Sequence, residues 1–167
     1  MTGTRKPTNP QTYKPVVRTY QARDNEAVWR LHLEGVTATR ESVDVDPKYD
    51  ADLRNIESDY LSEGSCFWVG EVDGEPIAMA AVQRIDARTG RLRRMRVTAT
   101  WRRRGVATML LKVAENFCRE QGYSRLILDT TEQQTAAHKL YENAGFARAG
   151  SRMMGQFRVY DYLKDLS

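Results

Sequence analysis

The sequence predicts an α+β fold: a mixed, mostly antiparallel, twisted sheet flanked by helices, with a βαβ unit at its centre. Its 167 residues, 41% of them hydrophobic, fit one globular domain. Strand and helix periodicities follow one another in the order βααβββαβαββ. The strand–helix–strand run from Leu92 to Leu128 implies two parallel strands, because the helix carries a crossover. We expect a flexible tail over residues 1–15, which hold three prolines, and a single domain over 16–167.

The first elements follow from residue type and spacing. A β-branched and aromatic run predicts a strand at 16–20. Apolar residues at helical spacing then predict a helix over Asp24–Val36, with Asp24 as the N-cap and Gly35 near its end. After a polar loop, helical spacing returns and predicts a second helix at about residues 53–61.

A hairpin is predicted in the middle of the chain. Strands at 66–72 and 75–85 flank Asp73-Gly74, a pair that accepts the positive φ angles of a tight turn. We expect a break at Arg88-Thr89-Gly90 and another strand over residues 92–97.

The remaining elements complete the predicted sheet. A helix runs over residues 104–121 and ends at Gly122. A short apolar strand follows at 126–128, then a helix at 134–143 and two final strands between 146 and 162.

Composition limits the classes of partner. The net charge is +4 and the pI about 9.2, and seven arginines fall between Arg91 and Arg104. Such a run is typical of a solvated surface, and no nucleic-acid-binding module surrounds it. Cys66 and Cys118 have neither disulfide-framework nor metal-ligand spacing. The chain has no membrane-length apolar stretch and no secretory signal, so we expect a soluble, cytoplasmic protein without a metal or a membrane partner.

One turn carries a specific chemical signal. The run Arg102-Arg103-Arg104-Gly105-Val106-Ala107 lies between a predicted strand and a predicted helix. Backbone N–H groups at a helix N-terminus bind anions, and Gly105 allows close approach because it has no Cβ. With the arginines, this anion cradle suits a pyrophosphate. A helix start with exposed arginines would have the same composition.

Two motifs together carry a family resemblance. They are Arg102-x-x-Gly105-x-Ala107 and Gln134-x-x-Ala137-x-x-Leu140-Tyr141-Glu142-x-x-Gly145-Phe146. In this order they resemble the GNAT superfamily of N-acetyltransferases over about residues 16–163. The run Leu128-Asp129-Thr130-Thr131 is similar to that of the small, camello-like members.

The resemblance implies an acetyltransferase that uses acetyl-CoA as co-substrate and transfers the acetyl group to a primary amine by direct attack in a ternary complex. It implies main-chain contacts to the pantetheine arm, phosphate contacts along the turn and an amide contact from the later helix. The residues implied are, in that order, Met95, Arg96 and Val97; Arg102, Arg103, Arg104, Gly105, Val106, Ala107 and Thr108; and Gln134.

Catalytic roles are only partly implied. Tyr141 matches the tyrosine that protonates the departing thiolate, although a buried aromatic anchor is the alternative. Arg91 occupies the position where relatives carry a glutamate base, so the base is unassigned. Asp129 as a base and Glu34 as a contact to the acceptor amine are candidates, against structural or capping roles. We expect the two histidines, His32 and His138, in solvent or packing positions.

The acceptor and the partners stay open. Loops at 37–50 and 151–157 are expected to shape the acceptor site, for a small-molecule or a protein amine. Five acidic residues favour a cationic acceptor, unless they form only a solvated loop: Glu41, Asp44, Asp46, Asp50 and Asp52. The aromatic strand 157–162 would pair across a homodimer interface. The alternatives are a non-catalytic acyl-CoA-binding or sensing module and a nucleic-acid-binding protein.

Overall fold

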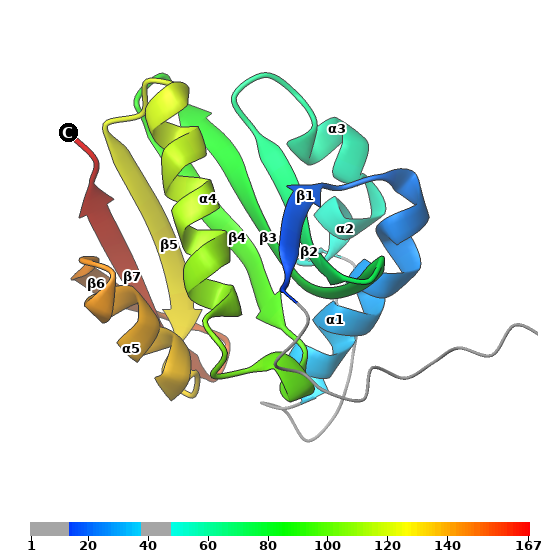
Figure 1. Ribbon diagram of the computed structural model, residues 1–167. Helices are drawn as coiled ribbons and strands as arrows, with labels where there is room; N and C mark the ends of the chain where they lie inside the picture. The colour runs from blue at the N-terminus through cyan, green and yellow to red at the C-terminus, as the bar shows by residue number, and fades with distance from the viewer. Residues whose placement is uncertain (1–13, 38–47) are drawn as a thin grey trace, which may run out of the picture.

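The computed structural model describes residues 14–37 and 48–167, so most of the predicted tail 1–15 and most of the predicted loop 37–50 lie outside the described residues. The described part forms a seven-stranded sheet in the order β1-β2-β3-β4-β5-β7-β6 (Figure 1). All neighbouring strands are antiparallel except β4 and β5. The strands are β1 (Val16–Thr19), β2 (Cys66–Val72), β3 (Glu75–Asp86), β4 (Thr89–Val97), β5 (Arg125–Thr131), β6 (Ala147–Met154) and β7 (Phe157–Asp165). The predicted α+β fold with a central βαβ unit is confirmed.

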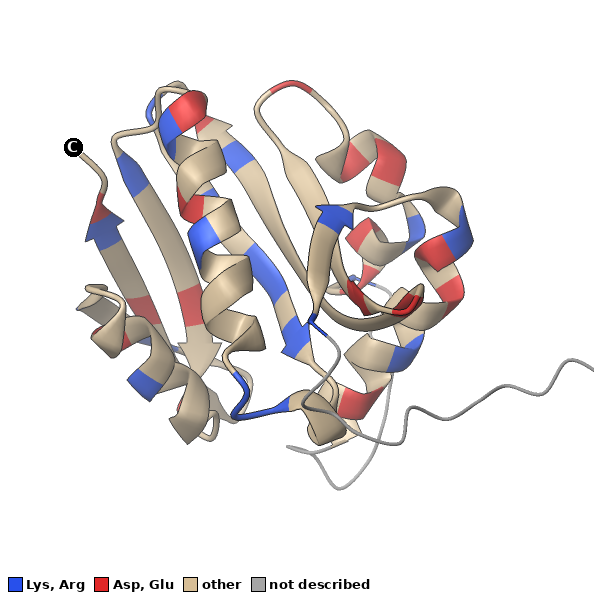
Figure 2. Cartoon of the chain, in the orientation of Figure 1, with Lys and Arg blue, Asp and Glu red and all other residues tan. Residues whose placement is uncertain are grey.

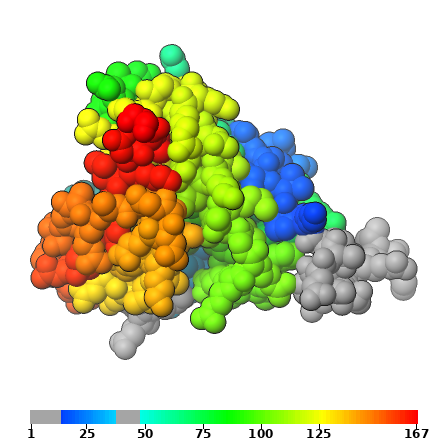
Figure 3. Space-filling model, turned by 60° about the vertical axis from the view of Figure 1, so that its left-hand side comes forward, coloured from blue at the N-terminus to red at the C-terminus, as the bar shows by residue number. Residues whose placement is uncertain are grey.

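Helices cover both faces of this sheet. They are the 3-10 turns η1 (Ala22–Asp24) and η2 (Ala99–Trp101) and the helices α1 (Asn25–Thr37), α2 (Ala51–Arg54), α3 (Ile56–Tyr60), α4 (Val106–Glu120) and α5 (Thr135–Asn143). In Figure 1, α4 crosses in front of β4 and β5. The space-filling view in Figure 3 places α5 and β6 (orange) beside α4 (yellow-green) on one surface.

Side-chain alternation along β2 and β3 separates two apolar cores. On β2, Trp68 faces the core formed with α4, whereas Phe67 and Val69 face the core formed with α1, α2 and α3. On β3, Ala80 faces the core formed with α4, and Met79 faces the core formed with α1, α2 and α3. Successive strand residues point to opposite faces, so these two strands are buried on both sides.

The parallel pair β4–β5 is short, and this positions the site. The two strands pair only between Thr89–Arg91 and Arg125–Ile127. Beyond that point β4 stays paired with β3, but its register shifts opposite Ala80, where Arg94 adopts a positive φ of 57°. Such a bulge bends a strand. The carboxyl ends of β4 and β5 therefore separate, at the end of the sheet where α4 begins (Figure 1).

Several predicted boundaries were wrong at the N-terminal side. Asp24 does not cap α1: its carboxylate accepts the Gln21 N–H at 2.8 Å and pairs with Arg18 at 2.7 Å, one turn earlier. Gly35 does lie near the end of α1, as predicted, and a Cβ there would come 2.4 Å from Arg96 Nε. The second helix is two short helices, because Asn55 leaves the helical region with φ −133° and ψ 43°.

Two further predictions were wrong within the sheet. Thr89 and Gly90 belong to β4 and not to the break before it. A Cβ on Gly90 would lie 3.1 Å from Cys118 Sγ, so this glycine permits close packing of α4 on the sheet. The strand 157–162 has no free edge for a second chain, because β7 is paired with β5 on one side and β6 on the other.

Candidate active site

The anion cradle has the backbone geometry that its sequence predicts. Gly105 is the N-cap of α4 with φ 79°, a region that L-residues with a side chain rarely adopt. The first helical bond runs from the Met109 N–H to the Gly105 carbonyl at 3.0 Å. The N–H groups of the three residues before it, Val106, Ala107 and Thr108, therefore have no partner within the helix.

The turn that leads into this N-terminus consists of basic residues, blue in Figure 2. Arg102 Nε donates to the Val97 carbonyl at 3.1 Å, which ties the turn to the end of β4. The Arg104 guanidinium lies 5.2 Å from the Trp101 ring centroid. A Cβ on Gly105 would meet no heavy atom within 4 Å, so the space beside the turn is open. An anionic group fits this turn, because a helix N-terminus and arginines both stabilise negative charge.

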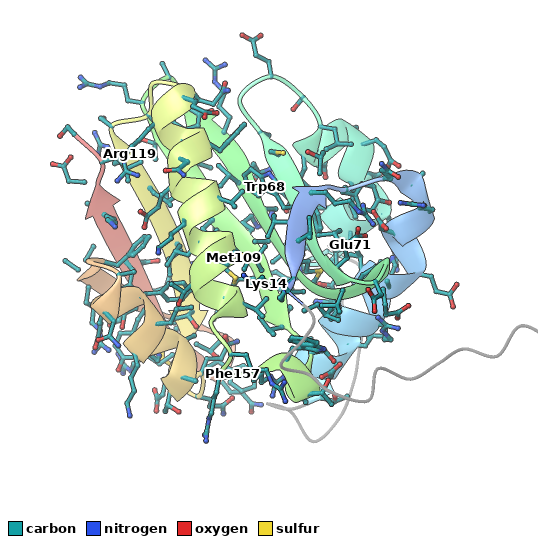
Figure 4. The ribbon with its side chains drawn as sticks, viewed as in Figure 1. Lys14, Trp68, Glu71, Met109, Arg119 and Phe157 are labelled. Atoms are coloured by element: carbon teal, nitrogen blue, oxygen red, sulfur yellow. The ribbon has the colours of Figure 1, made fainter. Side chains whose placement is uncertain are left out.

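A cleft of about 670 Å³ lies between the separated ends of β4 and β5. Its walls come from the end of α1, from β4 and β5, from α5 and from the β6–β7 hairpin. Phe157, labelled in Figure 4, marks the hairpin and lies near the end of the sheet where α4 begins. The predicted site residues that line the cleft are Met95, Arg96, Asp129, Gln134 and Tyr141. Val97, the cradle, Thr108 and Glu34 do not line it.

Tyr141 is buried at the base of the cleft. It is 6% exposed, and its ring packs edge-on against Phe146 at 5.7 Å and lies tilted against Tyr162 at 6.2 Å. Burial raises the pKa of Tyr141 to about 12, although the Arg96 guanidinium acts in the opposite direction. The hydroxyl therefore keeps its proton at neutral pH, as a proton donor must. Tyr141 is both an aromatic anchor and a candidate acid.

Asp129 is held by two arginines. Its Oδ2 accepts from Arg91 Nη2 at 2.7 Å and from Arg152 Nη2 at 2.6 Å. Arg152 also pairs with Asp161 on β7. These bonds occupy one of the two carboxylate oxygens, and they connect β4, β5, β6 and β7 around the cleft.

Glu34 contacts the chain after β4. Its carboxylate accepts the Ala99 N–H at 2.6 Å and the Thr98 hydroxyl at 2.9 Å. These bonds hold the end of α1 against η2, and they give Glu34 a structural role. Its predicted contact to the acceptor amine is untested.

The two histidines differ. His138 is buried and engaged at both ring nitrogens, with Tyr162 Oη 2.7 Å from Nδ1 and the Thr131 carbonyl 2.9 Å from Nε2, which confirms a packing position. His32, in contrast, lines the cleft, with Nε2 3.1 Å from Asp50 Oδ1. Burial lowers the pKa of His32, which favours its neutral form. Neither its place in the cleft nor its pairing with Asp50 was predicted.

Two of the five acidic residues thought to favour a cation are neutralised. Asp50 Oδ1 lies 3.2 Å from Arg94 Nη1, and Asp52 Oδ2 accepts Arg94 Nε at 2.9 Å. The other three lie outside the described residues. Five arginines line the cleft against two aspartates, so its described walls are positive. The arginines are Arg91, Arg93, Arg94, Arg96 and Arg152. The cationic-acceptor prediction finds no support in Asp50 and Asp52.

Metal and membrane features are absent from the part of the chain that the structure describes. No group of three or more His, Cys, Asp or Glu residues in that part is arranged to hold a metal ion. None of its helices has the length and apolarity needed to cross a bilayer.

A family model decides the identity of the fold. The model described as "Acetyltransferase (GNAT) family" matches residues 23–146, which include β4, the cradle, α4, β5 and α5. The chain belongs to this family. The matched residues span the cradle and both of the separated strands.

Individual relatives agree with the family assignment. The chain is 38% identical over 112 residues to human N-acetyltransferase 8, covering 64% of this chain and 49% of that protein. It is 42% identical over 101 residues to N-acetylaspartate synthetase of Danio rerio, covering 59% of this chain and 36% of that protein. The chain thus spans about half or less of the curated relatives it matches. A GNAT acetyltransferase of Staphylococcus aureus has the same fold, with a TM-score of 0.81 at 21% identity over 92% of this chain and all of that one.

Proposed function

We propose that this protein transfers an acetyl group from acetyl-CoA to a primary amine by direct attack in a ternary complex. One observation carries the proposal. A buried, protonated Tyr141 lines a cleft at the carboxyl ends of β4 and β5. The N-terminus of α4, with its unpaired N–H groups, lies at the same end of the sheet. This arrangement suits a donor that is anionic at one end and reactive at the other.

Each predicted group has a part in this proposal. The N–H groups of Val106, Ala107 and Thr108 hold the pyrophosphate, and Gln134 supplies an amide within the cleft. Bound acetyl-CoA supplies the thioester that the amine attacks. Main chain of β4 at Met95 and Arg96 contacts the pantetheine arm; the Met95 carbonyl, however, already accepts Arg96 Nη1 at 3.1 Å.

Tyr141 and the cleft arginines have different effects on the protonation of the reacting groups. Tyr141 donates its hydroxyl proton to the thiolate as the C–S bond breaks, a general-acid role. The proton that the attacking nitrogen loses as the new C–N bond forms passes through solvent and restores the Tyr141 hydroxyl. The excess of arginines around the cleft favours the neutral form of a bound amine, because nearby positive charge disfavours an ammonium. Asp129, with Oδ2 bound to two arginines, positions Arg91 and Arg152, and its predicted role as a base is untested.

A turnover assay separates this function from a non-catalytic acyl-CoA-binding module. The purified protein is incubated with acetyl-CoA and a panel of primary amines: amino acids, amino-acid amides, polyamines and a lysine-containing peptide. Release of coenzyme A that depends on one class of amine, with the N-acetylated product seen by mass spectrometry, supports the proposal. Tight acetyl-CoA binding without any product identifies the binding module.

A further inference from the structure

The cleft contains one arginine that forms no ion pair with any described carboxylate. Arg91 and Arg152 pair with Asp129, Arg94 pairs with Asp50 and Asp52, and Arg93 lies 3.7 Å from Asp52. None of the ion pairs among residues 14–37 and 48–167 includes Arg96. Its Nη1 instead donates to the carbonyl of its neighbour Met95.

Arg96 is also incompletely hydrogen-bonded. In the described part of the chain, two buried side-chain polar atoms lack a hydrogen-bond partner: Arg96 Nε and His32 Nδ1. Both residues line the cleft. Buried polar groups are nearly always satisfied, and an unbalanced buried charge is costly. Two such atoms on the walls of one cleft indicate that these walls are completed by a ligand.

The fold makes room for this arginine. Gly35 lies within α1, where glycine weakens a helix relative to alanine. A Cβ at that position would come 2.4 Å from Arg96 Nε and 2.5 Å from Arg96 Cδ. The absent side chain therefore lets the Arg96 stem lie against α1, which holds its guanidinium on the cleft.

Arg96 also lies close to the proposed chemistry. The Arg96 guanidinium acts on the pKa of Tyr141, and both residues line the cleft. The anion cradle does not line this cleft, so Arg96 is available to an anion other than the pyrophosphate. An anionic group held there sits beside the position where the amine must react.

From these contacts we infer that Arg96 binds a carboxylate of the acceptor, on the carbon that bears the reacting amine or next to it. The acceptor class is then amino acids with a free carboxylate and a free amine. A planar guanidinium recognises a carboxylate through paired hydrogen bonds. Arg96 sets specificity for the acceptor, and Gly35 positions Arg96. The inference rests on the proposed function.

Matched acceptors test the inference. Acetylation of L-alanine, L-phenylalanine and L-aspartate is compared with that of their carboxamides, which lack the negative charge. The amine of each carboxamide is less basic than that of the acid, so a larger fraction of it is neutral and reactive. This difference favours the carboxamides, which makes the comparison stringent. We expect kcat/KM of the preferred acid to exceed that of its amide about 10- to 100-fold, the usual worth of a hydrogen bond to a charged group. Equal or faster reaction of the amides overturns the inference and leaves the acetyltransferase proposal standing.

Variants assign the preference to Arg96. Arg96→Met, assayed at saturating acetyl-CoA, should remove the acid-over-amide preference, and Arg96→Lys should restore part of it. Gly35→Ala should reduce it in the same direction. Arg30→Met is the control, because Arg30 pairs with Glu75 on the surface, away from the cleft, and the preference should stay. A retained preference in Arg96→Met contradicts the assignment.

A binding measurement separates the two proposals if no amine is acetylated. The same acids and amides are titrated into the protein saturated with coenzyme A, followed by calorimetry. Binding of an acid to the wild type, and not to Arg96→Met, supports the carboxylate site even where the transfer proposal has failed. Absence of acid binding to the wild type overturns the carboxylate site.

Discussion

Arg94 Nε lies 2.9 Å from Asp52 Oδ2, and this contact joins the bulge of β4 to the short helix α2. The Tyr60 hydroxyl donates to the same carboxylate oxygen. Asp52 is buried, and although burial itself opposes the charged form, the bonds from Arg94 and Tyr60 lower the pKa of Asp52 below its ordinary value. The charge on Asp52 therefore stabilises the strand that forms one wall of the cleft.

Stability should fall in acid because of this carboxylate. A carboxyl group with a depressed folded pKa stabilises the fold above its unfolded pKa of about 3.9, and this is lost as pH falls through the folded value. Asp52→Asn should cost about 3 kcal/mol of unfolding free energy at pH 7, since it leaves Arg94 poorly balanced. Urea denaturation between pH 3 and pH 7 measures both effects, and the difference between wild type and variant should narrow below pH 4.

The control for this measurement is Glu57→Gln, on an exposed side chain of α3. It should change the unfolding free energy by less than about 0.5 kcal/mol. If the free energies of unfolding of the wild type and Asp52→Asn differed by the same amount at pH 3 and at pH 7, the charge of Asp52 would not stabilise the fold.

Tyr141→Phe should slow turnover and spare binding. Loss of a general acid lowers kcat by about 100-fold or more, whereas the acetyl-CoA dissociation constant should stay unchanged. Since the pKa of Tyr141 is raised to about 12, the wild-type kcat should not fall between pH 8 and pH 10 through loss of this proton. Steady-state kinetics across that range tests both statements.

Tyr123→Phe is the matched control for Tyr141→Phe. The Tyr123 hydroxyl is also buried, but it donates to the Gly64 carbonyl at 2.6 Å, away from the cleft. Its loss should reduce stability by about 1 kcal/mol and leave kcat alone. If kcat were the same in Tyr141→Phe and the wild type, Tyr141 would be an aromatic anchor and nothing more.

Asp129→Asn should act through the arginines that Asp129 holds. We expect the variant to have a higher KM for the acceptor than the wild type. The acid limb of its pH–rate profile should have the same midpoint as that of the wild type. Asp161→Asn, which removes the other carboxylate on Arg152, should reproduce part of the KM change. Disappearance of the acid limb in Asp129→Asn would instead identify Asp129 as the general base.

Local signals predicted the fold and the position of the turn before α4. The βαβ unit follows from helical and strand periodicities on either side of Gly105, and α4 begins directly after this glycine. The positive φ of Gly105 was not predicted. The boundary at Thr89-Gly90 was misplaced, because glycine marks both turns and close packing, and only the contact with Cys118 distinguishes them.

The acceptor side of the cleft could not be read from local sequence. The β4 bulge at Arg94 and its pairing with Asp50 and Asp52 join residues more than 40 positions apart, so they depend on strand register. Because the sequence does not reveal this pairing with Arg94, the acidic residues suggested a cationic acceptor. His32 was missed for the same reason, since its spacing on α1 resembles that of an ordinary packed residue.

Calorimetric titration with acetyl-CoA tests the central claim most directly, on the wild type, Gly105→Glu and Gly122→Glu. Gly122 is the control, because it has φ 80° and open space beside it at the other end of α4. The wild type and Gly122→Glu should bind acetyl-CoA alike, whereas Gly105→Glu should lose binding, because its side chain brings bulk and negative charge to the cradle. Equal acetyl-CoA affinity in all three proteins would contradict the placement of the cofactor at the N-terminus of α4.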